Sequence, residues 1–171
     1  AMDTMLAKIA DFYDDEVEAA VTRLIKLRDR VSDGDGCWAD LAPMFTDDVV
    51  YVDPAWGRIE GIDAVRAEVL GEAMDGLDWR FPTDHYLIDG DTVLIKWRQV
   101  IPGAGGTDFE QSGYSHLIYA GDGRFRYNED QLNMAHVIED LGASGWRPPA
   151  GMTMTMPPAS PNRDFSIPDP S

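Results

Sequence analysis

The feature that most constrains the fold of this chain is a stretch from residue 79 to 132 in which apolar and polar residues alternate between tight turns. The turns are Asp-Gly-Asp at residues 89–91 and Gly-Asp-Gly at residues 121–123, and such sequences supply the positive φ that short hairpin turns require. Strands joined by two- or three-residue turns are antiparallel. We therefore expect one antiparallel sheet, with long strands over residues 79–88, 93–100, 109–120 and 124–132.

Helices are expected before this sheet. Residues 4–31 carry apolar side chains at three- and four-residue steps, which indicates either one amphipathic helix or two in succession. Shorter helices are expected over residues 38–45 and 62–74, with a short buried strand between them that ends at Asp53. One further short helix is expected after the sheet, over residues 133–141. Because the helices precede the long strands rather than alternate with them, the fold class is α+β, with a curved, mostly antiparallel sheet and helices packed in its concave face.

Asp53 is the most informative single residue. Pro54 follows it, has no N–H to donate and disfavours helix at Asp53, so the strand stops there and the carboxylate is held at its rim. A carboxylate at the edge of an apolar cavity has its charged form disfavoured, and the raised pKa that results suits proton transfer. Asp before Pro is also a common turn initiator, so Asp53 could instead cap the turn that follows.

The composition excludes several kinds of partner. Because 31 acidic residues against 14 basic ones give a net charge of −17, neither nucleic acid nor a membrane is expected as a partner. No apolar run approaches the ~20 residues that a membrane helix needs. A lone cysteine, Cys37, allows no internal disulfide, which fits a reducing, cytoplasmic location. The histidines lack the spacing of metal ligands, so no metal site is expected.

The last part of the chain differs in composition from the rest. We expect a single domain over residues 1–142 and a C-terminal arm over residues 143–171, which holds seven of the eleven prolines. The arm also carries methionine at alternate positions, Met152, Met154 and Met156. We expect an extended arm that lays these methionines on its own sheet or on a second subunit.

Four motifs together resemble the nuclear-transport-factor-two-like superfamily, in particular the SnoaL-like polyketide cyclases and the ketosteroid isomerases. They are MFTDDVVYVDP at residues 44–54, GIDAV at 61–65, IDGDTV at 88–93 and the turn GDG at 121–123. The resemblance covers roughly residues 14–142. It implies a cone-shaped α+β barrel of the cystatin-like kind whose interior is a ligand pocket, commonly in a homodimer.

The resemblance implies roles for particular residues. Asp53 falls where ketosteroid isomerases place their general base. The tyrosine and the acid that assist that base would fall near Leu27 and Ser115, so this chain departs from that pattern. The cyclase branch instead uses an acid in the last strand, which is here Asp130, with Asn128 two residues earlier on the same face.

Two further branches of the superfamily match in part. His85 in the segment TDHYL resembles a histidine of the scytalone dehydratases, whose second histidine would fall near Gly103. The limonene epoxide hydrolases need Arg-x-Asp in the second long strand, where this chain has Arg98 but Val100 in place of the acid. These matches suggest dehydration as a further possible reaction type, but they do not select one branch.

Two hypotheses for the function follow. The first is a small-molecule isomerase, cyclase or dehydratase that uses cofactor-free acid–base chemistry on a hydrophobic substrate with a carbonyl or hydroxyl group. In it Asp53 is the base, His85 and Asp130 donate protons or orient the substrate, and the ligand site is lined by Tyr51, Trp56, Trp97, Ser115 and Asn128. The second is a non-catalytic small-ligand-binding or assembly module of the same fold.

The candidate residues also have structural interpretations, which stay open at this point. His85 alternates with apolar residues and could be a core histidine that shares a face with Phe81 and Leu87. Asp130 could pair with Arg126 or Arg98, or cap the last helix.

Overall fold

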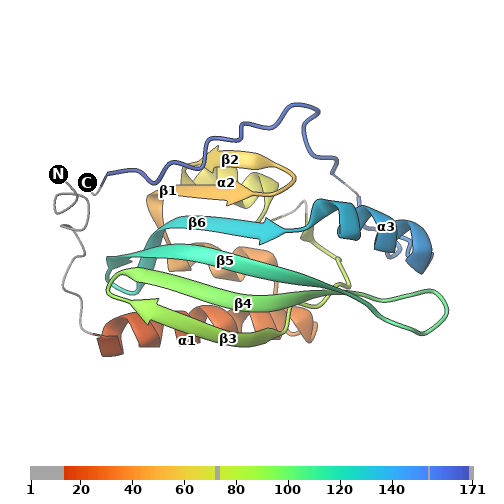
Figure 1. The fold of residues 1–171 in the computed structure, drawn as a ribbon, viewed down its shortest axis with the longest axis horizontal. Helices are drawn as coiled ribbons and strands as arrows, with labels where there is room; N and C mark the ends of the chain where they lie inside the picture. The colour runs from red at the N-terminus through yellow and green to blue at the C-terminus, as the bar shows by residue number, and fades with distance from the viewer. Residues whose placement is uncertain (1–13, 72–73, 154, 170–171) are drawn as a thin grey trace.

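The computed structural model describes residues 14–71, 74–153 and 155–169. Within these residues the strands form one sheet in the order β2-β1-β6-β5-β4-β3 (Figure 1). Neighbouring strands are antiparallel except β1 and β6, which are parallel. The strands are β1 (Phe45–Asp53), β2 (Gly57–Glu60), β3 (Thr83–Asp89), β4 (Thr92–Ile101), β5 (Phe109–Gly121) and β6 (Arg124–Leu132).

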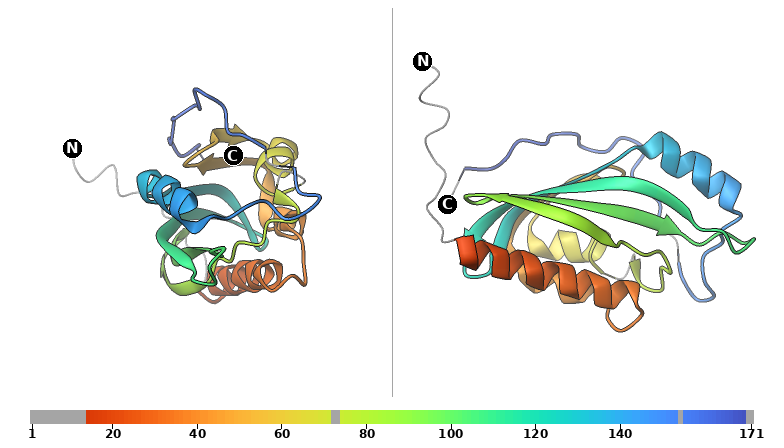
Figure 2. Two further views of the ribbon diagram at one scale, coloured as in Figure 1. Left: turned by 90° about the vertical axis from the view of Figure 1, so that its right-hand side faces the viewer. Right: turned by 60° about the horizontal axis from the view of Figure 1, so that its bottom comes forward.

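The helices pack on one side of this sheet, which curves around them (Figure 2). They are α1 (Asp14–Ser32), the 3-10 helix η1 (Trp38–Met44) and α2 (Ile62–Glu68), while α3 (Met134–Ser144) continues from the end of β6. One buried cluster joins the apolar stripe of α1 to the concave face of the sheet, and it includes Val17, Val21, Leu24, Val93, Ile95 and Leu117. The expected α+β class, with a curved sheet and helices in its concave face, is confirmed.

Three elements differ from the sequence-based expectation. Phe45, which was expected to end a helix over residues 38–45, begins β1, and residues 57–60, where no strand was expected, form β2 and pair with β1 antiparallel. Helix α2 ends at Glu68, not at residue 74. At Gly71 an added Cβ would lie 1.8 Å from the carbonyl oxygen of Arg66, so the chain turns back too closely there to continue as a helix.

Strand β3 contains a bulge that reverses the expected direction of its side chains. Thr83 lies opposite Trp97, but His85 lies opposite Lys96, so Asp84 is an extra residue on its strand. After the bulge it is Tyr86 and Ile88 that pack against the core. The prediction that His85 and Leu87 share the buried face of Phe81 was wrong, because both are exposed.

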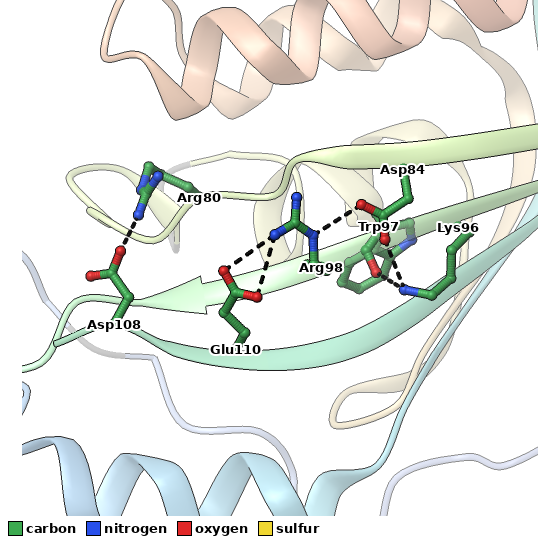
Figure 3. Close-up of polar contacts among 7 residues, drawn as sticks. All are labelled: Arg80, Asp84, Lys96, Trp97, Arg98, Asp108 and Glu110. Carbon is green, nitrogen blue, oxygen red and sulfur yellow. Dashed lines mark hydrogen bonds and ion pairs between the residues drawn. The ribbon is translucent and has the colours of Figure 1, made fainter.

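Ion pairs on the outer face of the sheet hold this bulge in place. The Nε atom of Arg98 donates to Oδ1 of Asp84 at 2.9 Å, and Lys96 Nζ lies 3.4 Å from Oδ2 of the same carboxylate. Arg98 also lies 3.2 Å from Glu110 on β5, so it bridges two strands (Figure 3). Exposed pairs of this kind stabilise a fold only slightly, but here they determine which way Asp84 points.

The C-terminal arm begins after α3 and runs back along the β2 side of the sheet (Figure 1). Trp146 is buried, stacks edge-on against Trp79 at 5.2 Å, and donates its indole N–H to Asp78 at 2.8 Å. Further on, the backbone N–H of Arg58 donates to the carbonyl oxygen of Asn162 at 2.8 Å. Gly57 makes this approach possible, since an added Cβ there would lie 2.3 Å from that oxygen.

The arm is attached mainly through its backbone carbonyls, not through its methionines. Arg58 donates to the carbonyl of Ser166 at 2.7 Å, and the hydroxyl of Tyr127 donates to that of Phe165 at 2.8 Å. Of the three alternating methionines, Met152 lies against Gly76, Met156 is exposed, and Met154 falls outside the described residues. Met156 therefore does not lie on the sheet of its own chain, and the alternative, that it lies on a second subunit, stays a prediction.

Removing the arm beyond residue 160 should expose the outer-face cluster that contains Tyr127, which is now fully buried together with Val50, Val52 and Ile118. We expect the shortened chain to melt at a lower temperature and to associate more readily, by differential scanning calorimetry and light scattering. Phe165→Ala is the control, because its side chain is exposed and its carbonyl remains. Equal melting of all three proteins would contradict attachment through the backbone.

Candidate active site

A chain of hydrogen-bonded side chains crosses the concave face of the sheet. Asp130 on β6 accepts from the hydroxyl of Tyr51 on β1 at 2.7 Å and from the hydroxyl of Ser115 on β5 at 2.6 Å. Ser115 in turn accepts from the indole N–H of Trp97 on β4 at 2.8 Å. The ladders explain this meeting, because Ser115 is the direct cross-strand partner of Asp130, and Tyr51 pairs with Asn128 two residues earlier on the same face.

Tyr51 is held as a neutral proton donor. Burial raises the pKa of its phenol well above the usual range, and the neighbouring Asp130 raises it further by charge and by hydrogen bonding. The phenol therefore keeps its proton at any physiological pH. It is available to donate to Asp130 or to an oxygen that takes the place of Asp130.

Asp53 lies at the end of β1, where the sequence predicted it. Its Oδ1 atom accepts from the backbone N–H groups of Ala55 at 2.7 Å and Trp56 at 2.9 Å, so Asp53 does cap the turn. Burial raises the pKa of its carboxyl to about 6, and Asp130 also raises it, while the two N–H donors act in the opposite direction. No hydrogen bond to Oδ2 occurs among the described residues, so capping leaves one oxygen free for proton transfer.

Arg28 is a site residue that the sequence analysis missed. It lies on α1, is 9% exposed, and places its guanidinium over the ring of Trp97 at 5.9 Å. Its Nη2 donates to the hydroxyl of Thr83, whereas its Nε is buried without a partner among the described residues. Burial lowers the pKa of Arg28, and the proximity of Asp130 and Tyr51 opposes this. Arg28 lies four residues after Leu24 and therefore on the apolar stripe of α1. A charged residue in that stripe could have been recognised from the sequence as a candidate for the interior.

The structure brings together most, but not all, of the predicted residues. Those on the concave face are Tyr51, Asp53, Trp97, Ser115, Asn128 and Asp130. Asn128 is buried, and its Nδ2 has no partner in the described part of the chain. Trp56 packs partly buried against the core at the β1–β2 turn. His85 does not join them, because the bulge in β3 turns it to the exposed outer face.

Asp130 makes neither of the ion pairs that the sequence left open. Arg98 pairs with Asp84 and Glu110 on the outer face, and Arg126 donates to the carbonyl of Pro168 in the arm. Asn133, rather than Asp130, caps α3 by accepting from the N–H of Ala135. Asp130 is thus committed to the interior network.

Asp53 and Asp130 are each partly exposed as residues. Two hollows at the surface lie away from these carboxylates. One of about 590 Å³ lies between η1, α2 and the start of β6 and is bordered by Phe45, Ile62, Arg66 and Arg124, and one of about 730 Å³ runs along the outer side of α1. Among the described residues, no three His, Cys, Asp or Glu side chains gather where they could hold a metal ion. No described helix is long and apolar enough to cross a membrane.

The sequence-family model of the SnoaL-like domain matches residues 26–128 of this protein, which is more than half of the chain. This protein belongs to the SnoaL-like family. The matched segment of this SnoaL-like protein runs from α1 to β6 and includes Arg28, Tyr51, Asp53 and Asn128, but it ends before Asp130. A comparison with curated proteins finds no match.

Solved structures share the fold at low sequence identity. A candidate SnoaL-like polyketide cyclase from Jannaschia sp. is 16% identical, with a TM-score of 0.60, over 75% of this chain and 93% of that one. A nuclear-transport-factor-two-like protein of unknown function from Burkholderia pseudomallei is 15% identical, with a TM-score of 0.58, over 72% and 95%. TerC, co-crystallized with polyporic acid, is 15% identical, with a TM-score of 0.57, over 72% and 96%. At these identities the similarity shows the fold.

Asp53 should destabilise the fold when it is ionised, because its folded pKa of about 6 lies above the ordinary aspartate value of 3.8. The cost is absent below the unfolded pKa and grows as the pH rises through 6. We expect Asp53→Asn, which can still accept from Ala55 and Trp56, to raise the free energy of unfolding by about 1–3 kcal/mol near pH 8 and by much less near pH 4.

Urea unfolding at both pH values measures this effect. Asp84→Asn is the control, because Arg98 and Lys96 hold the pKa of Asp84 low and its loss should not stabilise the protein at either pH. A stability change in Asp53→Asn that does not depend on pH would show that Asp53 is not an ionisable group with a raised pKa.

Proposed function

We propose that this SnoaL-like protein is a small-molecule enzyme that catalyses isomerisation, cyclisation or dehydration by acid–base chemistry without a cofactor. The observation that carries the proposal is the position of Asp53, a carboxyl group with a pKa of about 6 and one free oxygen, beside the Asp130 network. A base is most useful when its pKa lies near the working pH. Its substrate is a hydrophobic molecule with a carbonyl or hydroxyl group.

In the proposed reaction, ionised Asp53 takes a proton from a carbon atom next to a substrate carbonyl. The electron pair of that C–H bond moves into the new double bond, and the carbonyl oxygen becomes an enolate. Tyr51, a neutral donor, holds the substrate carbonyl when its single O–H turns from Asp130 to the substrate oxygen, while Asp130, still held by Ser115, accepts from a substrate hydroxyl. Where the substrate carries a C=C bond next to that carbon, the enolate is conjugated with it, and protonated Asp53 returns the proton to the far carbon of that bond, which shifts the double bond, completes an isomerisation and restores the base.

The environment of the network supports a hydrophobic, ring-containing substrate. Trp97 is buried between Phe81, at 5.9 Å between ring centroids, and the guanidinium of Arg28. Aromatic side chains of this kind bind planar apolar molecules well. His85 has no part in this mechanism, since it lies exposed on the outer face.

A non-catalytic ligand-binding or assembly module remains the second candidate. It is favoured by one observation, that the two surface hollows described above are bordered by neither Asp53 nor Asp130. In such a module Asp53 would only cap the turn to Ala55 and Trp56. The two functions differ in whether the protein accelerates proton exchange at carbon.

Deuterium exchange distinguishes them. The probe is 2-tetralone, a bicyclic ketone whose protons next to the carbonyl exchange slowly in D₂O and can be followed by NMR. We expect exchange that increases with pH through an inflection near 6, because Asp53 must be ionised. Asp53→Asn should lower the rate by about a hundredfold or more.

His85→Gln is the matched control, since it changes an ionisable residue outside the proposed site and should leave the rate unchanged. Exchange that is no faster than in buffer, or that survives in Asp53→Asn, would favour the binding module.

We also propose that the protein forms a homodimer through the outer face of the sheet and works in the cytoplasm. Leu87 and Leu94 are cross-strand partners on that face, and both are exposed, as is Tyr114 beside Lys96. Exposed apolar side chains that adjoin one another commonly mark an interface. A cytoplasmic location suits the free, exposed thiol of Cys37, and the net charge of −17 argues against nucleic acid as a partner.

Replacing both Leu87 and Leu94 by Glu should convert the dimer to a monomer in sedimentation velocity, because four like charges would meet across the interface. Ile138→Glu, an equally exposed apolar residue on α3, should leave the dimer intact. A wild-type protein that sediments as a monomer would contradict the proposed dimer.

A further inference from the structure

Arg28 is a buried cation whose charge no described residue neutralises by contact. Its hydrogen bond to Thr83 is to a neutral hydroxyl, and its neighbour Trp97 offers only a ring face. No carboxylate of the described residues forms an ion pair with it, although other arginines and a lysine of the described residues do form such pairs. Burying an unpaired cation costs free energy, so a buried arginine without an ion-pair partner commonly has a function.

We infer that Arg28 binds an anionic oxygen of the ligand and makes the site select planar acidic hydroxyl compounds, such as phenols and enols of dicarbonyl compounds. This inference rests on the proposed function in that the same interior must admit a small molecule. It goes beyond that function by naming the class of ligand and the residue that recognises it.

The donors of Arg28 are available for this role. A guanidinium has five N–H groups in a fixed planar arrangement, and within the described residues only Nη2 has a hydrogen-bond partner. Nε is buried without one. A buried donor that lacks a partner costs free energy, and an oxygen of the ligand would recover that cost.

The nearby carboxylates of Asp130 and Asp53 do not accept hydrogen bonds from Arg28 in place of a ligand oxygen. Asp130 is close enough to affect the pKa of Arg28 but is satisfied by Tyr51 and Ser115. Asp53 is directed to the turn by Ala55 and Trp56. The charge of Arg28 therefore stays available to an incoming anion.

The position of Trp97 favours a flat ligand. The guanidinium lies over its ring, and the indole N–H is fixed by Ser115. Because Trp97 is buried beneath the guanidinium, a conjugated ligand would meet the planar guanidinium rather than the indole ring, with its oxygen or by stacking on it. In the proposed reaction the same N–H groups would stabilise the enolate oxygen that forms when Asp53 removes the C–H proton.

Binding of 4-nitrophenol tests the inference, because its phenolate is coloured and its phenol is not. We expect the wild-type protein to bind the phenolate and to lower the pKa of the bound probe below its value in water. Arg28→Met should weaken phenolate binding by about tenfold to a hundredfold, the range for a charge-assisted hydrogen bond. Arg28→Lys keeps the charge but not the planar donors, so its affinity for the phenolate should lie between those of the wild type and Arg28→Met.

Arg23→Met is the matched control, since Arg23 is exposed on the same helix and its loss changes the net charge equally. Urea unfolding of each variant shows that it is folded at the pH of the binding measurement. The inference is overturned if wild-type protein binds no probe, if it binds the neutral phenol, or if Arg28→Met binds the phenolate as tightly as Arg23→Met.

The two proposals can fail separately. Asp53→Asn should still bind the phenolate if Arg28 is the anion site, even if the exchange reaction is absent. If the exchange of 2-tetralone depends on Asp53 but phenolate binding is unchanged in Arg28→Met, the inference about Arg28 is contradicted and the proposed function is not.

Discussion

The two hydrogen bonds that reach the Asp130 carboxylate are the interactions on which the interior depends. They join side chains of β1, β5 and β6 across the concave face, because Tyr51 and Ser115 donate to opposite oxygens of one group. Two donors offset much of the cost of partly burying a carboxylate. Through Ser115 the network also fixes the indole of Trp97, and the ring of Trp97 is the surface over which Arg28 lies.

The same interior contains a second carboxylate in a different environment. Asp130 accepts from two hydroxyl groups, whereas Asp53 accepts from the backbone on one oxygen only and has its pKa raised to about 6, mainly by burial. Where two acids are placed so differently, they can perform different tasks at one pH. The raised pKa of Asp53 also means that the fold gives up stability at neutral pH, as is common where a group is kept for chemistry.

The features that were predicted correctly from the sequence are those determined by residues adjacent in the chain. Asp53 could be placed because Pro54 stops the strand, and the hairpins could be placed because the turns at 89–91 and 121–123 need positive φ. The face of His85 could not be predicted, because the extra residue Asp84 appears only in the pairing of β3 with β4, where Arg98 and Lys96 contact its carboxylate. Network partners such as Tyr51 with Asp130 are 79 residues apart, so no local pattern predicts their bond. Arg28 was predictable in principle, as a charged residue on an apolar stripe.

The strongly acidic surface and the buried cation act over different distances. The net charge of −17 repels a free anion in solution, but salt screens that repulsion beyond about 8–10 Å. At contact, the guanidinium of Arg28 acts where water is largely excluded and its attraction for an oxygen anion is much stronger. The ligand favoured by both conditions is one that is neutral in solution and becomes anionic only inside, by losing a proton. A weakly acidic hydroxyl compound meets that requirement, as does a ketone that Asp53 would convert to its enolate in the proposed reaction, and a permanent anion does not.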